Sequence, residues 1–161
     1  MKAIDTASAR GLLARLRSLD WGWTAVEVPD LLRRFGWVSV ASAEGGAVIA
    51  DAGFGLTGSE VRILLDGDKV DSIVVRVTGV PAEGDDARLQ AHDAFVSLVR
   101  TATELFGEPT RRIQNEDPQV DWRDERTTLS VGRIAGVASV TLMTNEYRDF
   151  WDEELDDDWE T

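Results

Sequence analysis

The sequence contains no cysteine, one histidine and only two lysines in 161 residues. Without cysteine there is no disulfide framework and no thiolate to bind a metal or act as a nucleophile, which agrees with a reducing compartment. Because His92 stands alone, a zinc site built on two histidines is excluded, and a serine triad would have to use this one ring. Catalysis by cysteine or by paired histidines is therefore excluded. Pairs of carboxylates could still serve acid–base chemistry, but in a chain with 30 acidic residues such pairs are weak evidence.

Long apolar runs are also missing. No stretch of about 18 apolar residues is present, so we expect no membrane-spanning segment. Asp5 and several arginines interrupt the N-terminal apolar residues, whereas a secretory signal needs an uninterrupted apolar stretch. We expect a mature cytoplasmic start. The scarcity of lysine beside abundant Ala, Val, Asp and Gly is typical of a GC-rich genome and indicates an actinobacterial source.

Acidic residues are abundant and concentrated at the C-terminus. The net charge is −13, and residues 147–161 (YRDFWDEELDDDWET) carry eight carboxylates against one arginine, which is more than half of that charge. Such a protein repels phosphate backbones, so we expect no nucleic-acid partner and a basic protein as the natural complement. The segment also has two tryptophans, a tyrosine and a phenylalanine, which acidic tails that only remain solvated lack.

The N-terminal part predicts two helices. Leucines recur at helical spacing over residues 6–19, with arginines elsewhere around the turn. A second helix is predicted from Thr24, because Glu27 follows at capping-box spacing, and Gly36 is its expected end. Pro29 lies too far along this segment for the first turn, which leaves the start of the second helix open.

The later part predicts a long helix over residues 86–106, with Gly107 as its stop. A final short helix is predicted with Asn145 as its cap. Its apolar stripe would consist of Tyr147, Phe150, Trp151 and Leu155.

The remaining segments read as strands separated by turns. Strand-like runs cover residues 37–42, 47–52, 60–67, 70–78, 110–114, 119–122, 127–134 and 137–145. Glycine and aspartate in the connections favour tight antiparallel hairpins. We therefore predict an α+β fold with a mainly antiparallel sheet and helices packed on one face. Residues 1–150 would form a single α+β domain, and residues 151–161 an acidic C-terminal tail.

Three features invite a functional interpretation and also have a plainer one. Residues 53–58 match the dinucleotide-binding pattern GxGxxG, but the segment after them ends in a hairpin turn and does not continue as a helix, which favours a glycine-rich connection between strands. The aspartates near residue 68 lack the glycine and glutamate of a calcium loop, which favours a turn. His92 lies in the predicted long helix, away from any nucleophile motif, and is interpreted as an ordinary helical residue. We expect no enzyme, no metal and no cofactor.

The six tryptophans separate into two groups. We assign Trp21, Trp23, Trp37 and Trp122 to the core, where large rings dominate burial. Trp151 and Trp159 lie among carboxylates, which cannot be buried unpaired. Trp151 is expected to close the apolar face of the domain, and Trp159 to be exposed.

Two stretches resemble an uncharacterised family of small acidic actinobacterial proteins. These are DWGWTAVEVPDLLRRFGW and DAFVSLVRTATELFGEPTRR, the latter followed by PQVDWRDERTTLSVGRI and VTLMTNEYRDFWDE, together about half the chain. The shared patterns consist of core and turn residues, so the resemblance implies a family fold and brings no catalytic residues. The family is similar in size, acidity and layout to immunity proteins of polymorphic toxin systems, and in architecture to small secretion chaperones.

Our leading hypothesis is an immunity protein that binds and neutralises a basic toxin domain through an acidic surface. The expected partner-binding residues are Asp149, Trp151, Asp152, Glu153, Glu154, Asp156, Asp157, Asp158 and Trp159. A plainly solvated terminus is the alternative interpretation of this segment. Alternative functions are a secretion chaperone or adaptor for an exported client, and a small ligand-binding domain or enzyme.

Overall fold

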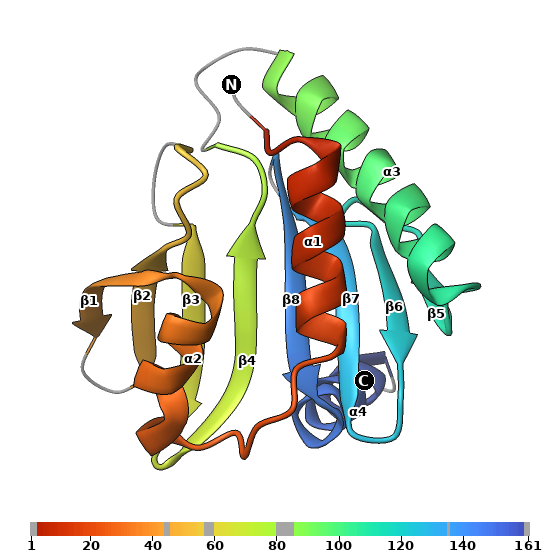
Figure 1. The fold of residues 1–161 in the computed structure, drawn as a ribbon. Coiled ribbons are helices and arrows are strands. Elements are labelled where there is room, and N and C mark those ends of the chain that lie inside the picture. The colour runs from red at the N-terminus through yellow and green to blue at the C-terminus, as the bar shows by residue number, and fades with distance from the viewer. Residues whose placement is uncertain (1–2, 44–45, 57–59, 80–85, 135, 160–161) are drawn as a thin grey trace.

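The computed structural model describes the chain except for residues 1–2, 44–45, 57–59, 80–85, 135 and 160–161 (Figure 1). Its elements are α1 (Thr6–Arg17), the 3₁₀ helix η1 (Ala25–Glu27), α2 (Val28–Phe35), β1 (Val38–Ala43), β2 (Ala47–Asp51), β3 (Val61–Asp66), β4 (Lys69–Arg76), α3 (Asp86–Phe106), β5 (Arg111–Ile113), β6 (Gln119–Arg123), β7 (Thr127–Ile134), β8 (Val137–Thr144) and α4 (Asn145–Trp159). None of the helices in the described part of the chain has the length and apolar character needed to cross a bilayer.

All eight strands form one antiparallel sheet in the order β1-β2-β3-β4-β8-β7-β6-β5. Strands β1 to β4 form one meander and β5 to β8 a second, and the two join where β4 pairs with β8. At this junction Ile73 lies opposite Leu142, and both side chains are buried. The predicted α+β class with a mainly antiparallel sheet is confirmed.

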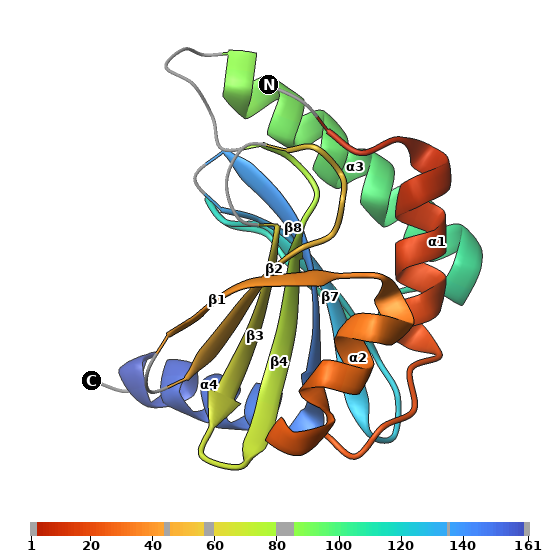
Figure 2. The ribbon, with the colours of Figure 1, turned by 60° about the vertical axis from the view of Figure 1, so that its left-hand side comes forward.

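Helices α1, α2 and α3 cover one face of the sheet (Figure 2). Helices α1 and α3 pack against each other and over β7 and β8, while α2 lies against β1. Leucines of α1 meet inward-facing strand residues, and Leu13, Leu16, Val140 and Leu129 are fully buried between them. The prediction of helices on one face holds for these three, whereas α4 lies on the other side of the sheet (Figure 2).

The second predicted helix is divided at its N-terminus into η1 and α2. Pro29 therefore occupies the first turn of α2, where its missing N–H leaves no hydrogen bond unmade. The capping box predicted from Thr24 forms only in part. Glu27 accepts the Thr24 hydroxyl at 2.7 Å and the Gly22 N–H at 2.9 Å, but Thr24 caps no backbone N–H. Gly36 ends α2 in the left-handed conformation, with φ of 70°.

The start of α4 differs from the prediction. The hydroxyl of Thr144, and not the side chain of Asn145, accepts the first-turn N–H of Tyr147 at 3.2 Å. Asn145 is held elsewhere, because its amide oxygen accepts the Thr128 hydroxyl at 2.8 Å and its amide nitrogen donates to the Asp124 carbonyl at 2.9 Å. Asn145 therefore joins α4 to β7 and to the β6–β7 turn.

The tryptophans assigned to the core are placed there with one exception. Trp21, Trp37 and Trp122 are buried, and the Trp122 indole donates a hydrogen bond to the Gly107 carbonyl at 2.9 Å. Trp23 is half-buried, and among the described residues it is the one non-glycine residue with a positive φ, 56°. A bulky residue in that conformation is strained, which makes Trp23 a candidate for a functional role.

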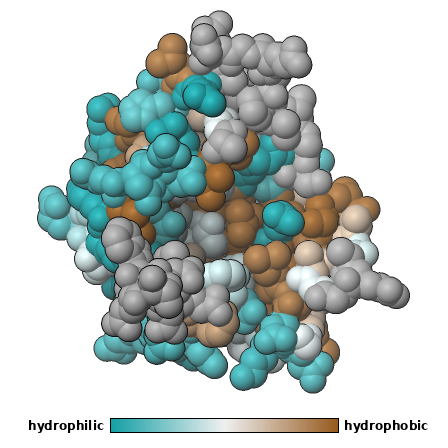
Figure 3. All heavy atoms as spheres, turned by 180° about the vertical axis from the view of Figure 1, so that it is seen from behind, coloured by the Kyte–Doolittle hydropathy of each residue, from teal (hydrophilic) through white to brown (hydrophobic). Residues whose placement is uncertain are grey.

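The face of the sheet opposite α1, α2 and α3 has two different halves. Below α4 it is polar, with Thr128 and Ser130 of β7 buried. Over β1 to β4 it is mostly apolar. Ile49, Leu64 and Val74 face this side by their strand register, and the exposed Arg62 lies between Ile49 and Val74. Figure 3 shows apolar residues gathered over this half of the sheet. In Figure 1, α4 lies behind the lower ends of β7 and β8, and no described helix lies behind β1 to β3.

The segment that matches GxGxxG connects β2 to β3, as the plainer interpretation predicted. Gly53 and Gly55 have positive φ, and Gly58 lies outside the described residues. The buried carboxylate of Glu60 accepts the backbone N–H groups of Ala52, Phe54 and Leu56 at 2.8, 3.2 and 2.9 Å. These amides, which a phosphate would need, are therefore already bonded to a carboxylate of the same chain.

We expect Glu60→Gln to destabilise the fold by about 1.5–3 kcal/mol, because an amide cannot accept all of these N–H groups. The measurement is equilibrium denaturation by urea. The exposed Glu116→Gln is the matched control and should leave the midpoint unchanged. Equal stability of the two variants would contradict this role of Glu60.

Candidate functional site

The nine residues predicted to bind a partner all lie on α4. The helix runs through the boundary between residues 150 and 151 at which the sequence analysis places the start of a tail. Side chains are described for Asp149, Trp151, Asp152 and Glu153. Those of Glu154, Asp156, Asp157, Asp158 and Trp159 lie outside the described residues.

Asp149 pairs with an arginine of the same chain. Its two carboxylate oxygens accept Nη1 and Nη2 of Arg123, at the end of β6, at 2.7 and 3.1 Å. This two-pronged hydrogen bond lowers the pKa of Asp149 and raises the pKa of Arg123. Asp149 therefore helps to hold α4 against the sheet, so it is not a free acidic group on the surface.

A second set of charges lies beneath α4. Arg148 and Asp121 of β6 are both buried, and Arg148 Nη2 lies 2.9 Å from Asp121 Oδ2, an ion pair whose geometry is not that of a hydrogen bond. Asp121 also accepts the Ser130 hydroxyl at 2.5 Å and the Gln119 amide at 3.0 Å. Because a buried charge without its partner costs about 3–5 kcal/mol, this pair fixes α4 in place.

Asp152 also faces inward. Its carboxylate lies 2.9 Å from Arg111 Nη1 of the edge strand β5 and 3.6 Å from Arg148 Nε. Two of the nine predicted residues, Asp149 and Asp152, therefore take part in docking the helix. The sequence analysis did not identify the arginines that pair with them. Arg148, the one basic residue among the eight carboxylates of residues 147–161, was the available signal that this segment forms ion pairs within the chain.

Aromatic rings of α4 are exposed on its outer side. Phe150 and Trp151 are 53% and 44% exposed, and Trp151 touches Tyr147 and Phe150 edge-on at centroid distances of 6.1 and 5.9 Å. The expectation that Trp151 closes the apolar face of the domain is therefore wrong. The carboxylates of Asp149 and Asp152 take the inward positions of the helix, which leaves Trp151 on the outside.

A pocket of about 460 Å³ adjoins the first turns of α4. We call it the Trp23 pocket. It is lined by Gly22, Trp23 and Thr24, by Asp66, Lys69, Val70 and Asp71 of the β3–β4 hairpin, and by Thr144, Glu146, Tyr147 and Phe150. Segments far apart in the sequence thus meet here. The sequence signal was the pair of tryptophans around Gly22, which we had assigned to the core.

The Trp23 pocket carries more negative than positive groups. Asp66, Asp71 and Glu146 line it, and Lys69 is the one cation among the described lining residues. Burial, and then the negative charges of Asp66 and Glu146, raise the pKa of Asp71, while Lys69 opposes the shift. The carboxylates of the pocket therefore repel one another when no cation is bound between them.

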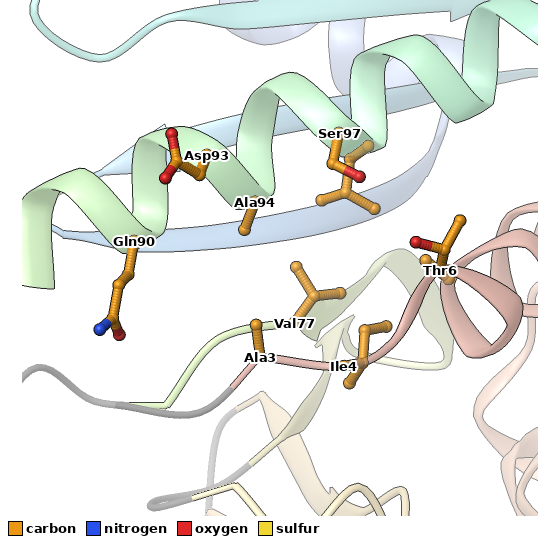
Figure 4. A pocket seen from close by; sticks show the side chains of 10 residues that line it. Ala3, Ile4, Thr6, Val77, Gln90, Asp93, Ala94 and Ser97 are labelled. Carbon is orange, nitrogen blue, oxygen red and sulfur yellow. The ribbon is translucent and has the colours of Figure 1, made fainter.

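A second pocket, of about 330 Å³, lies between the N-terminal segment, α1 and α3. Figure 4 shows Ala94 and Ser97 of α3 on one side of it, with Ala3 and Ile4 on the other. Most of its side chains are small or apolar, and its polar ones include no histidine, lysine or arginine among the described lining residues. This lining suits apolar contacts more than acid–base chemistry.

Other candidate chemistry is not assembled within the described residues. There, no three side chains of His, Cys, Asp or Glu come together as metal ligands. Asp66 and Asp68 flank the β3–β4 turn around Gly67, which has φ of 61°, in agreement with the turn interpretation. His92 lies exposed on α3 and lines none of the described pockets.

The raised pKa of Asp71 predicts a pH-dependent penalty. Its carboxyl keeps a proton to higher pH in the folded protein than in the unfolded chain, so ionisation as the pH rises through the folded value costs stability. We therefore expect Asp71→Asn to raise Tm at neutral pH, with a gain that shrinks as the pH falls through the raised folded pKa and is lost below 3.8, the ordinary value of the carboxyl. Thermal unfolding over this pH range is the measurement, and Asp68→Asn, on the same hairpin, should show no such gain.

Comparison with family models matches residues 7–144 to a family of unknown function, DUF6301. Among curated proteins and solved structures, no match was found. The matched region runs from α1 to the last residue of β8, so α4 follows it directly. The resemblance to an uncharacterised family is thus confirmed, whereas the actinobacterial source and the likeness to immunity proteins stay predictions. The chain belongs to the DUF6301 family of unknown function.

Proposed function

We propose that this protein binds a basic protein partner through the outer side of α4, and that the partner is a toxin domain which it neutralises. The observation that carries the proposal is the exposure of Phe150 and Trp151 on a helix rich in carboxylates. Large exposed rings surrounded by charge are typical of interface centres, where aromatic residues contribute a large share of the affinity.

The docking of α4 supports this proposal. A frayed acidic tail would lose much conformational entropy on binding, which weakens its affinity. Here the ion pairs of Arg148 with Asp121 and of Arg123 with Asp149 hold the first turns against the sheet. Trp151 is consequently presented in a fixed position before any partner arrives.

The charge of the helix supports a basic partner. Since Asp149 and Asp152 are paired within the chain, the steering charge falls to Glu153 and to the acidic residues that follow it in the sequence. Their summed field attracts a positive surface over distances of about 8–10 Å at moderate salt. A toxin acting on RNA, DNA or a nucleotide needs such a positive surface for phosphates, and an acidic inhibitor would occupy it.

We expect Trp151→Ala to weaken binding of the partner by about 2 kcal/mol or more, which is roughly a 30-fold rise in Kd. The measurement is isothermal titration with the basic C-terminal domain of a secreted protein encoded by the neighbouring reading frame. Leu89→Ala is the matched control, because Leu89 is also an exposed large apolar residue but lies on α3, across the sheet.

A one-to-one complex that abolishes the activity of a folded toxin domain is the expected result. An equal loss of affinity in the Trp151→Ala and Leu89→Ala variants, or no loss in either, would contradict the assignment of the interface to α4. Light scattering distinguishes the chaperone alternative, in which a dimer would hold an unfolded client segment. The uncovered apolar half of the sheet is the surface such a client would use.

We expect the paired substitutions Glu153→Gln and Glu154→Gln to slow association about tenfold at low ionic strength and to flatten its salt dependence. Stopped-flow mixing at several salt concentrations measures both effects. The control is Glu116→Gln with Asp117→Asn. It removes the same number of negative charges from the loop that precedes the first residue of β6, whereas Arg123, which pairs with α4, is the last residue of that strand. An association rate that falls equally in both double variants would show a general field, with no contribution specific to α4.

A further inference from the structure

The Trp23 pocket is held in shape by backbone hydrogen bonds. The Val70 N–H donates to the Trp23 carbonyl at 2.9 Å, and the Ala25 N–H donates to the Asp68 carbonyl at 2.8 Å. The segment from α1 to η1 is thus fastened to the β3–β4 hairpin by the Trp23 carbonyl and, two residues later, by the Ala25 N–H. Behind it, the ring of Trp21 lies 5.2 Å from that of Trp23 at an angle of 47°.

This fastening maintains a conformation that Trp23 would otherwise avoid. A positive φ in a residue with a Cβ costs about 1–2 kcal/mol. The pocket therefore retains a strained backbone and an aromatic wall together. The outer walls come from Tyr147 and Phe150 of α4, and Phe150 is more than half exposed.

The lining selects the chemical class of ligand. Carboxylates outnumber cations three to one among the described lining residues, so an anion is disfavoured. A metal ion does not fit either, since no three acidic side chains of the described residues converge as ligands. Aromatic faces beside carboxylates suit an organic cation, which the rings and the charges both attract. A guanidinium fits best because it is planar, stacks on rings and donates to carboxylates in pairs.

We propose that the Trp23 pocket receives an arginine side chain of the partner, with its guanidinium against the ring of Trp23 and bonded to Asp71 and Glu146. The inference rests on the proposed function insofar as the partner is a basic protein. It adds an anchoring point at the base of α4, apart from the exposed ring of Trp151. A bound guanidinium would also neutralise the carboxylates whose negative charges repel one another in the pocket.

The test uses N-acetylarginine amide as the probe and N-acetylcitrulline amide as its neutral isostere. Proton–nitrogen spectra resolve the indole groups of the six tryptophans, and Trp23→Phe assigns the signal of Trp23. We expect the arginine probe to shift the Trp23 signal saturably, with an affinity in about the millimolar range, and the citrulline probe to have little effect. Asp71→Asn should weaken the arginine probe about tenfold, whereas Asp68→Asn should not.

Equal shifts with both probes, or equal affinity in the Asp71→Asn and Asp68→Asn variants, would overturn the inference. Unchanged indole spectra of these variants without probe show that they are folded. The two proposals fail separately. If the toxin domain binds through Trp151 while the arginine probe leaves Trp23 unmoved, only the pocket assignment is lost; if the probe binds but no basic protein does, the proposed function is lost.

Discussion

A charge buried beneath a helix must have its counter-charge there too, and in this protein that requirement is met by Arg148 and Asp121. The pair sits between α4 and β6, where Ser130 and Gln119 supply further hydrogen bonds. With Arg148 in place, the helix can lie only one way round on the sheet. Its aromatic residues then face outward, and its first turns form one wall of the Trp23 pocket.

The carboxylates of the C-terminal segment consequently have two roles. Those in the first turns of α4 neutralise arginines of β5 and β6, which would otherwise be an uncompensated basic strip on this side of the sheet. Those that follow give the segment its excess negative charge. Asp149 and Asp152, which pair with arginines, thus precede the six other acidic residues of residues 147–161. The family match ends where this helix begins.

Most of the fold could be predicted because its signals are local. Alternating apolar residues predicted the strands, leucine spacing predicted α1, and Gly36 predicted the end of α2. What could not be predicted depends on contacts between distant residues. The pairing of Asp149 with Arg123 and the choice of Thr144 over Asn145 as a cap follow from the packing of α4 on the sheet. The composition of the Trp23 pocket has the same origin, since three separate segments build it.

The junction of the two meanders has a kinetic consequence. Each meander pairs neighbours in sequence, so its hairpins can close quickly. The contact of β4 with β8, by contrast, must close a loop that contains α3 and three strands, and it brings Ile73 to Leu142. Closing so long a loop costs conformational entropy before the buried contacts between the two meanders can form. During synthesis the N-terminal meander therefore waits with β4 as an open edge until the last strand has left the ribosome.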